Sequence, residues 1–292
     1  MLNSRASQNQ HVQLTQLSWH RSDVEQTLYF AGGRFTRVNT LLTFLTGLLL
    51  ACSFYLLLMF LPFPGLRSKF FDQGVIPYAT VMLAAWSLAI LFFKWRKLQM
   101  QRQCLTMSIV PDDPGFVLSP NTVEQVLERI DHLVDDPRQF VLMNRVCIAL
   151  ANLRNLGRVT DVDEILRSQA ESDEAISESS YILLVGFLWA IPILGFIGTV
   201  LGLSIAIGEF GSVMSSGGAG ADALLPALKQ VTGGLAIAFD TTLVALVFAL
   251  VIQLLMTFLK KSEQEFLDHC AEYCSRNIVN RLRLLPFHQN ET

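Results

Sequence analysis

The chain has 292 residues, of which 51% are hydrophobic and only 16% are charged, and its mean hydropathy is +0.41. This composition is too apolar for an ordinary soluble protein and predicts an integral membrane protein. The net charge of -3 gives no basis for nucleic-acid binding, and the five cysteines form neither a C-x-x-C pair nor a ligand-spaced cluster with the five histidines. We therefore expect no nucleic acid, metal site or disulfide framework.

The N-terminal segment, residues 1–38, is polar and rich in glutamine. No apolar core follows the initiator closely, so we expect a cytoplasmic segment without a cleavable signal peptide. A weak amphipathic pattern, which includes Leu17 and Trp19, predicts a helix that lies at the membrane interface.

The first transmembrane hairpin is predicted over residues 39–95. An uncharged stretch of 29 residues lies between Arg37 and Arg67 and ends in the helix-terminating sequence LPFPG. A second stretch, of 21 residues, lies between Asp72 and Lys94. Because about 20 helical residues cross a bilayer core of about 30 Å, each stretch is long enough to span the membrane.

Residues 96–180 are predicted to form a cytoplasmic helical segment. Apolar residues recur with helical period after the helix-start signal SPN until the sequence DDP interrupts them, and a second helix follows over about 138–156. A third helix is expected to continue into the membrane at Tyr181. Its acidic end, AESDEAISESS, fits a solvated helix face, with a gating or partner-binding role as the alternative.

A second transmembrane hairpin is predicted over residues 181–259. It contains two apolar stretches of thirty residues, whose only charge is Asp240 in the second. Both stretches exceed the length of a span. The loop between them, about 208–233, includes the flexible run SSGGAGAD. Residues 260–292 are predicted to form a cytoplasmic C-terminal helix that extends the last span.

Small residues form one face of each arm of this second hairpin. They recur at three- and four-residue spacing, a pattern that lets membrane helices approach closely. The predicted helix-packing residues are Pro192, Gly195, Gly198 and Gly202 in the first arm and Ala238 and Ala245 in the second. If one subunit cannot satisfy two such faces, the stripes predict an oligomer.

Each stripe also carries a threonine, Thr199 in the first arm and Thr242 in the second. At about 1.5 Å per residue, each lies roughly 25 Å from the same membrane face, so the two hydroxyls are predicted to be level. Two interpretations stay open. Each hydroxyl either bonds its own helix backbone within a packing stripe or lies beside an ion path.

Asp240 is the one ionisable residue predicted inside a span. It lies about 20 residues, roughly 30 Å, from Lys260, which places it near the outer interface. Because it is two residues from Thr242, about 200 degrees around the helix, the two side chains cannot face the same direction. We expect either a polar anchor at the outer mouth or a site where ions enter.

The positions of the basic residues indicate the orientation. Lys94, Arg96, Lys97 and Arg102 flank the second span and Lys260 and Lys261 flank the last, whereas the loop between the third and fourth spans has a single basic residue. Under the positive-inside rule, both termini face the cytoplasm. The predicted fold is an all-α integral membrane protein with four transmembrane helices.

Two motifs in the second hairpin resemble a known family. The first arm reads P-x-LGFIGTVLG from Pro192, and the second reads GGLAIAFDTTLVAL. In this order on adjacent membrane helices, they resemble the MotA/TolQ/ExbB ion-channel family over about residues 120–270. The resemblance implies a homopentameric ring whose pore surrounds two copies of a one-span partner similar to MotB, TolR or ExbD. It also implies that Thr199 and Thr242 lie beside the ion path.

The function expected from this resemblance is that of a pore-wall subunit in a bacterial inner-membrane motor, driven by transported H⁺ or Na⁺ and rotating about the partner helices. The relay carboxylate missing from this chain would be a membrane Asp of the partner. No P-loop, GxSxG or HExxH motif is present, so we expect no enzyme activity and no cofactor. The alternative is a passive oligomeric scaffold or a non-rotary pore without ion coupling. A flagellar stator in the strict sense is less favoured, because the cytoplasmic segment shows no residue-by-residue match to the MotA rotor-contact motif.

Overall fold

The computed structural model describes residues 17–27, 30, 32–71, 73–111, 116–119, 122–156, 159–215 and 221–282. Within these residues, the regular elements are helices, and extended pairing is limited to two isolated bridges. The chain divides into two compact units. The polar unit comprises Met1–Asn39, Phe93–Ser180 and Leu259–Thr292, and the apolar unit comprises Thr40–Phe92 and Tyr181–Phe258.

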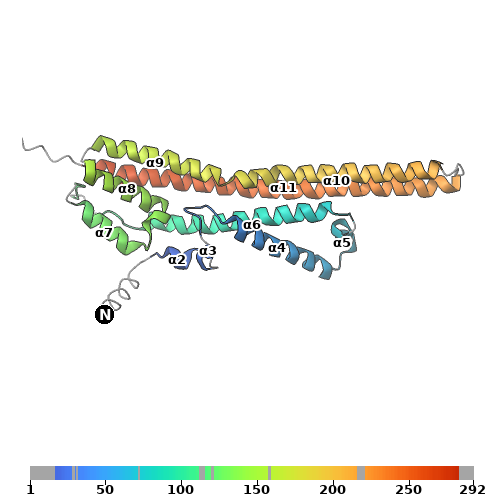
Figure 1. Cartoon of the computed structure of the whole chain (residues 1–292), viewed down its shortest axis with the longest axis horizontal. Coiled ribbons are helices and arrows are strands. Elements are labelled where there is room, and N and C mark those ends of the chain that lie inside the picture. The colour runs from blue at the N-terminus through green and yellow to red at the C-terminus, as the bar shows by residue number, and fades with distance from the viewer. Residues whose placement is uncertain are drawn as a thin grey trace, which may run out of the picture. The chain divides into compact units, whose positions relative to one another are not determined.

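Four helices are long and apolar enough to cross a membrane, so the four predicted spans are confirmed and the chain is a multi-pass membrane protein. A short helix, α5 (Pro64–Phe71), connects the first two spans. Figure 1 shows the last two helices side by side. The four helices are α4 (Thr40–Phe60), α6 (Ile76–Gln103), α10 (Ile182–Ser215) and α11 (Ala221–Asn277).

The polar unit is built from shorter helices together with the ends of α6 and α11. The sequence DDP separates two of these helices, as the interrupted periodicity predicts, and the Asp136 side chain caps the turn that follows it. The helices are α2 (Trp19–Ser22), α3 (Val24–Thr27), α7 (Val123–Leu133), α8 (Val141–Leu156) and α9 (Val159–Ser179), with short turns η1 (Cys104–Thr106), η2 (Pro137–Gln139) and η3 (Val279–Arg281).

The helix expected to continue through Tyr181 into the membrane is interrupted there. Helix α9 ends at Ser179 and α10 begins at Ile182, so a break separates the polar helix from the span. The unbroken helical sequence pattern did not reveal this break.

The loop expected over 208–233 is largely helical. Helix α10 continues to Ser215 and α11 begins at Ala221, because the sequence ADALLPALKQ is rich in alanine and leucine, which favour helix. Pro226 lies close to the start of α11, where it removes one backbone hydrogen bond without breaking the helix. Most of the flexible run falls on residues 216–220, outside the described residues.

The predicted interfacial helix is wrong in its described part. Leu17 and Trp19 are buried in the polar unit, at 6% and 1% exposure, and do not form a surface for lipid. The Trp19 ring packs edge-on against Phe140 at 5.5 Å. Residues 1–16 of the same pattern lie outside the described residues.

Helices α4 and α6 form the first hairpin of the apolar unit and meet at Gly47. A Cβ atom added there would lie 2.7 Å from the Cα of Trp86, so the backbones are in direct contact. The indole Nε1 of Trp86 donates to Thr43 at 3.3 Å, and its ring lies 4.6 Å from that of Phe187 on α10. Trp86 therefore holds the first hairpin against the second.

A second apolar cluster joins α4, α5, α6 and α11. Phe54 lies at its centre, with its ring centroid 5.2 Å from Phe70 and 6.4 Å from Phe248. The first hairpin therefore covers one side of the second. The buried members are Ala51, Leu58, Phe70, Val81 and Ala85, and Phe54, Tyr55, Phe71, Met82, Val244 and Phe248 pack against them.

Candidate functional site

The two small-residue stripes lie against each other inside one chain. A Cβ added to Gly195 would lie 2.6 Å from the Cβ of Ala245 and 3.2 Å from the Cα of Thr242. At Gly202 the corresponding atom would lie 3.1 Å from the Cβ of Ala238. Glycine is needed at these positions because the opposing helix occupies the space of a side chain.

Gly198 lies in the same contact but also faces the first hairpin. A Cβ there would lie 2.7 Å from the Thr241 hydroxyl and 3.3 Å from a methyl group of Ile76 on α6. The stripes are thus satisfied within the hairpin, and they do not by themselves predict an oligomer. The step from two small-residue faces to assembly was wrong because the sequence did not reveal that the faces would meet.

The structure brings the two predicted threonines together at the centre of this contact. The hydroxyls of Thr199 and Thr242 are hydrogen-bonded to each other. The oxygen of Thr199 lies 3.2 Å from both the Gly195 and the Ala238 carbonyl oxygens, and that of Thr242 lies 3.0 Å and 3.3 Å from the same pair. We call these four oxygens the threonine cluster.

The hydroxyls of the threonine cluster bond both their own helix and the facing one, whereas the role beside an ion path stays a prediction. Each hydroxyl reaches the carbonyl four residues earlier in its own helix and also reaches the facing helix. A hydroxyl has one proton to donate and two lone pairs, so the two protons are shared among four oxygens. The direction of donation can therefore reverse by hydroxyl rotation alone.

Asp240 pairs with a residue of the connection between α4 and α6. Its Oδ1 lies 2.8 Å from the Nζ of Lys69 on α5, and Gln73 donates to its Oδ2 at 3.5 Å. The two charged side chains are 38% and 28% exposed, so the pair contributes at most about 1 kcal/mol. This geometry is that of an anchor between helices. Sequence reasoning missed Lys69 because 171 residues separate it from Asp240.

Helices α10 and α11 also form an open groove of about 850 Å³. Pro192 lines this groove and so lies at the edge of the stripe contact. Trp189 and Phe196 are the most exposed of its large side chains, at 71% and 65%, and Gln253 is its polar residue. The lining residues are Val185, Leu188, Trp189, Pro192, Ile193, Phe196, Leu246, Ala249, Leu250, Gln253 and Met256.

Comparison with protein-family models matches residues 142–272 to the MotA/TolQ/ExbB proton channel family. This part of the chain is a MotA/TolQ/ExbB domain. The matched residues contain both stripes and the threonine cluster, and the family that they match is one of proton channels. No match to the chain was found among curated proteins or among solved structures.

Two buried ion pairs stabilise the polar part of the MotA/TolQ/ExbB domain, one between α8 and α9 and one between α6 and α11. Arg145 of α8 donates from Nε to Asp173 of α9 at 2.6 Å, with both side chains at most 3% exposed. Asp173 belongs to the acidic run predicted to be a solvated face, and its burial is an exception to that prediction. Lys94 lies 3.4 Å from Glu263 of α11 and is 1% exposed.

The burial of Lys94 and Lys97 changes which residues give evidence about the orientation of the chain in the membrane. Lys94 and Lys97, which the sequence analysis counted among the basic residues that flank the second span, are bonded inside the protein, whereas Lys260 and Lys261 are exposed. Only the exposed lysines are placed to meet lipid headgroups.

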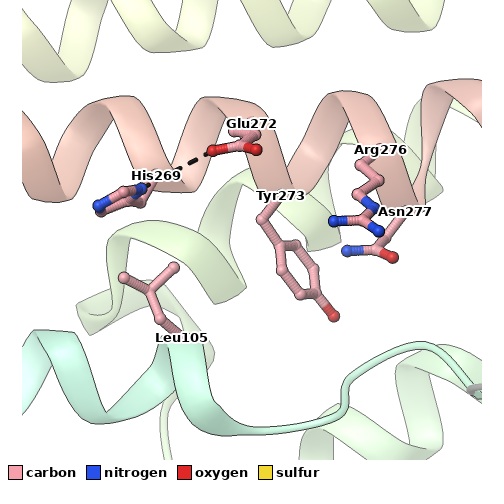
Figure 2. A pocket seen from close by; sticks show the side chains of 6 residues that line it. All are labelled: Leu105, His269, Glu272, Tyr273, Arg276 and Asn277. Carbon is pink, nitrogen blue, oxygen red and sulfur yellow. Dashed lines mark ion pairs between the residues drawn. The ribbon is translucent and has the colours of Figure 1, made fainter.

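A shallow pocket of about 340 Å³ lies between η1 and the end of the MotA/TolQ/ExbB domain in α11 (Figure 2). Leu105 and Tyr273 extend into it from the two elements, and exposed His269 lies 3.8 Å from Glu272. No group of three or more potential metal ligands occurs among the residues that the structure describes. The free cysteines Cys270 and Cys274 are buried, as expected for a reduced structural pair.

Proposed function

We propose that the chain is the pore-wall subunit of an inner-membrane motor that converts H⁺ or Na⁺ flux into work by rotating a ring about partner helices. The MotA/TolQ/ExbB domain supports this proposal. The observation that carries it is the polar content of the hairpin. In the sequence of its two apolar stretches, 179–208 and 230–259, Asp240 is the one charged residue, and it is already paired with Lys69.

The relay carboxylate therefore comes from a partner. Ion transfer through hydrocarbon needs an ionisable group near the middle of the membrane, and the proposed source is the membrane Asp of a one-span MotB/TolR/ExbD-like protein, present in two copies. The threonine cluster supplies hydroxyl and carbonyl oxygens, which lower the cost of releasing an ion from that carboxylate in a medium of low dielectric constant.

The ring is a homopentamer in this proposal, and the number five rests on the family alone. The open groove is the surface on which a neighbouring copy packs, because exposed side chains such as Trp189 and Phe196 extend across one face of the hairpin. The bilayer covers the remaining apolar surface. Both termini lie in the cytoplasm, as the exposed Lys260 and Lys261 indicate.

Valine substitutions of the threonine cluster test the proposal. Thr199→Val and Thr242→Val keep the side-chain shape but remove the hydroxyl. We expect each variant to purify with the partner at normal yield and to lose ion flux in proteoliposomes. Thr232→Val is the matched control, because Thr232 lies on α11 and its exposed hydroxyl bonds only its own helix in the described contacts.

Two results would contradict the ion-path role. Full flux in both valine variants would show that the hydroxyls serve packing alone. A large loss of yield, absent in Thr232→Val, would show that the cluster holds the hairpin together before it conducts anything.

The passive oligomeric scaffold or non-rotary pore is the second candidate, because packing alone explains the small residues of both stripes. A scaffold needs neither a partner carboxylate nor a gradient. Proteoliposomes containing the chain and its partner would then pass no ions under an imposed gradient. An adjacent reading frame that encodes a one-span protein with a membrane Asp would favour the motor.

A further inference from the structure

The N-terminal segment is attached to the polar unit through Lys97 of α6, whose side chain is 2% exposed. Its Nζ donates to Oε2 of Glu25 at 2.6 Å and to the carbonyl oxygens of Gly33 and Arg37 at 3.1 Å and 2.7 Å. An ammonium group has three N–H donors. All three are used by these contacts.

Asp23 lies beside this ammonium group without receiving a hydrogen bond from it. Its side chain is fully buried, and Oδ2 lies 3.8 Å from the Nζ of Lys97. In the described part of the chain, Oδ2 accepts no hydrogen bond, and Oδ1 accepts one from the backbone N–H of Glu25 at 3.3 Å. An ionised carboxylate buried with so few donors is strongly disfavoured.

The charged groups that face Asp23 do not balance the negative charge that its ionised carboxylate would carry. Lys97 is engaged by Glu25, which is itself negative, and Arg96, which lines the same small cavity, is exposed to solvent. One turn away, Lys94 pairs with Glu263. The buried network therefore has three carboxylates and two ammonium groups. Burial raises the pKa of Asp23, with a further increase from the charge of Glu25, and the opposing effect of Lys97 is smaller.

We propose that Asp23 is a proton-binding site, at which a neutral carboxyl group fixes the N-terminal segment against α6. The neutral form needs no cation and carries its own O–H donor. The cavity has no space for a larger ligand, since a Cβ added to Gly32 would lie 2.4 Å from Oδ2 of Asp23. This site stands apart from the proposed ion path and does not depend on it.

The sign of the pH dependence follows from proton linkage. When the segment is detached, Asp23 titrates near its ordinary pKa of about 3.9, whereas in the attached state its pKa is raised. Between these two values, the attached state binds more protons. The detachment constant therefore rises with pH, by up to about tenfold per pH unit, and levels off above the raised pKa.

Hydrogen–deuterium exchange of residues 17–39 in the full-length protein measures this detachment. Asp23→Asn replaces the carboxyl group with a neutral group of the same shape. Comparing both proteins at each pH cancels the intrinsic pH dependence of exchange. We expect the wild-type detachment constant to rise with pH relative to Asp23→Asn, and the variant to be at least as protected above the raised pKa.

His20 is the control, because its exposed ring contacts Gln26 and no group of the buried network in the described contacts. His20→Gln should keep the wild-type slope. The same slope in Asp23→Asn, or weaker attachment of that variant at every pH, would overturn the proposal.

Infrared difference spectroscopy of the wild-type protein gives a second measurement that does not require a stable variant. A protonated buried carboxyl group has a C=O stretching band that ionisation removes. We expect this band in the wild-type protein at pH values between the ordinary pKa of Asp and the raised pKa of Asp23. The band should be absent from Asp23→Asn if that variant folds. The absence of the band from the wild-type protein, or its persistence in Asp23→Asn, would overturn the assignment.

Discussion

Adding one methyl group at Gly195 should weaken the α10–α11 hairpin. The Cβ of Gly195→Ala would lie 2.6 Å from that of Ala245, whereas ordinary van der Waals contact begins near 3.4 Å. The helices must therefore separate by about 0.8 Å. Because Thr242 lies 3.0 Å from the Gly195 carbonyl oxygen, this separation also stretches the threonine cluster.

Two opposing terms determine the size of the effect. Alanine is more favourable than glycine inside a helix by about 1 kcal/mol, whereas overpacking a close contact costs about 1–3 kcal/mol. We expect Gly195→Ala to destabilise the hairpin by a net ~0–2 kcal/mol. The contact with the Thr242 Cα atom, at 3.2 Å, favours the upper end because backbone cannot move aside as a side chain can.

Gly186 supplies the matched control on the same helix. A Cβ there would meet nothing within 4 Å, so Gly186→Ala changes only the helix propensity. Unfolding in mixed micelles should show Gly186→Ala equal to the wild type or up to about 1 kcal/mol more stable. Equal stabilities for the Gly195→Ala and Gly186→Ala variants would refute the close contact between the two stripes.

Two further predictions concern polar contacts. If the pair of Lys69 and Asp240 is an anchor, Lys69→Met and Asp240→Asn should each lower the stability by at most about 1 kcal/mol and should show coupling in a double-mutant cycle. Both variants should leave ion flux unchanged. Reduced flux in Asp240→Asn alone would instead indicate a site of ion entry. Burial raises the pKa of Asp135, but N–H groups including that of Trp19 and the hydroxyl of Ser18 more than offset this and hold it below the ordinary value. The contribution of Asp135 to stability is therefore present above the ordinary pKa and lost as the pH falls through the lowered pKa. Because Asp135 is exposed to solvent, Asp135→Ala should weaken the attachment of residues 17–39 only modestly at neutral pH and less in acid, as measured by their hydrogen exchange.

The four spans could be predicted because each depends only on a local property, an uncharged stretch of sufficient length. The motif that begins at Pro192 likewise identified the MotA/TolQ/ExbB domain. Helix rise predicted that Thr199 and Thr242 lie level, which agrees with the contact between their hydroxyls, although the contact itself was not predicted. These inferences needed no knowledge of which surfaces meet.

The partners of buried charges could not be predicted for the opposite reason. Lys97 lies just beyond an apolar stretch, as a headgroup anchor would, but its carboxylate partner Glu25 is 72 residues away. Asp173 lies among acidic residues that are mostly exposed, and only the position of Arg145 on a neighbouring helix distinguishes it. Composition and periodicity contain no information about such distant pairs.

The residues that give evidence about assembly and orientation therefore differ from those that the sequence analysis used. The stripe that contains Gly195 is occupied within the chain, so the ring proposed above assigns the neighbouring copy to the groove that Trp189 lines. Lys94 and Lys97 bind carboxylates inside the polar unit, so the positive-inside argument depends on exposed basic residues such as Arg96, Lys260 and Lys261. In both cases, residues of a type typical of a membrane-protein surface form contacts inside the protein. Only exposed residues of that type give evidence about contacts with a neighbouring copy or with lipid headgroups.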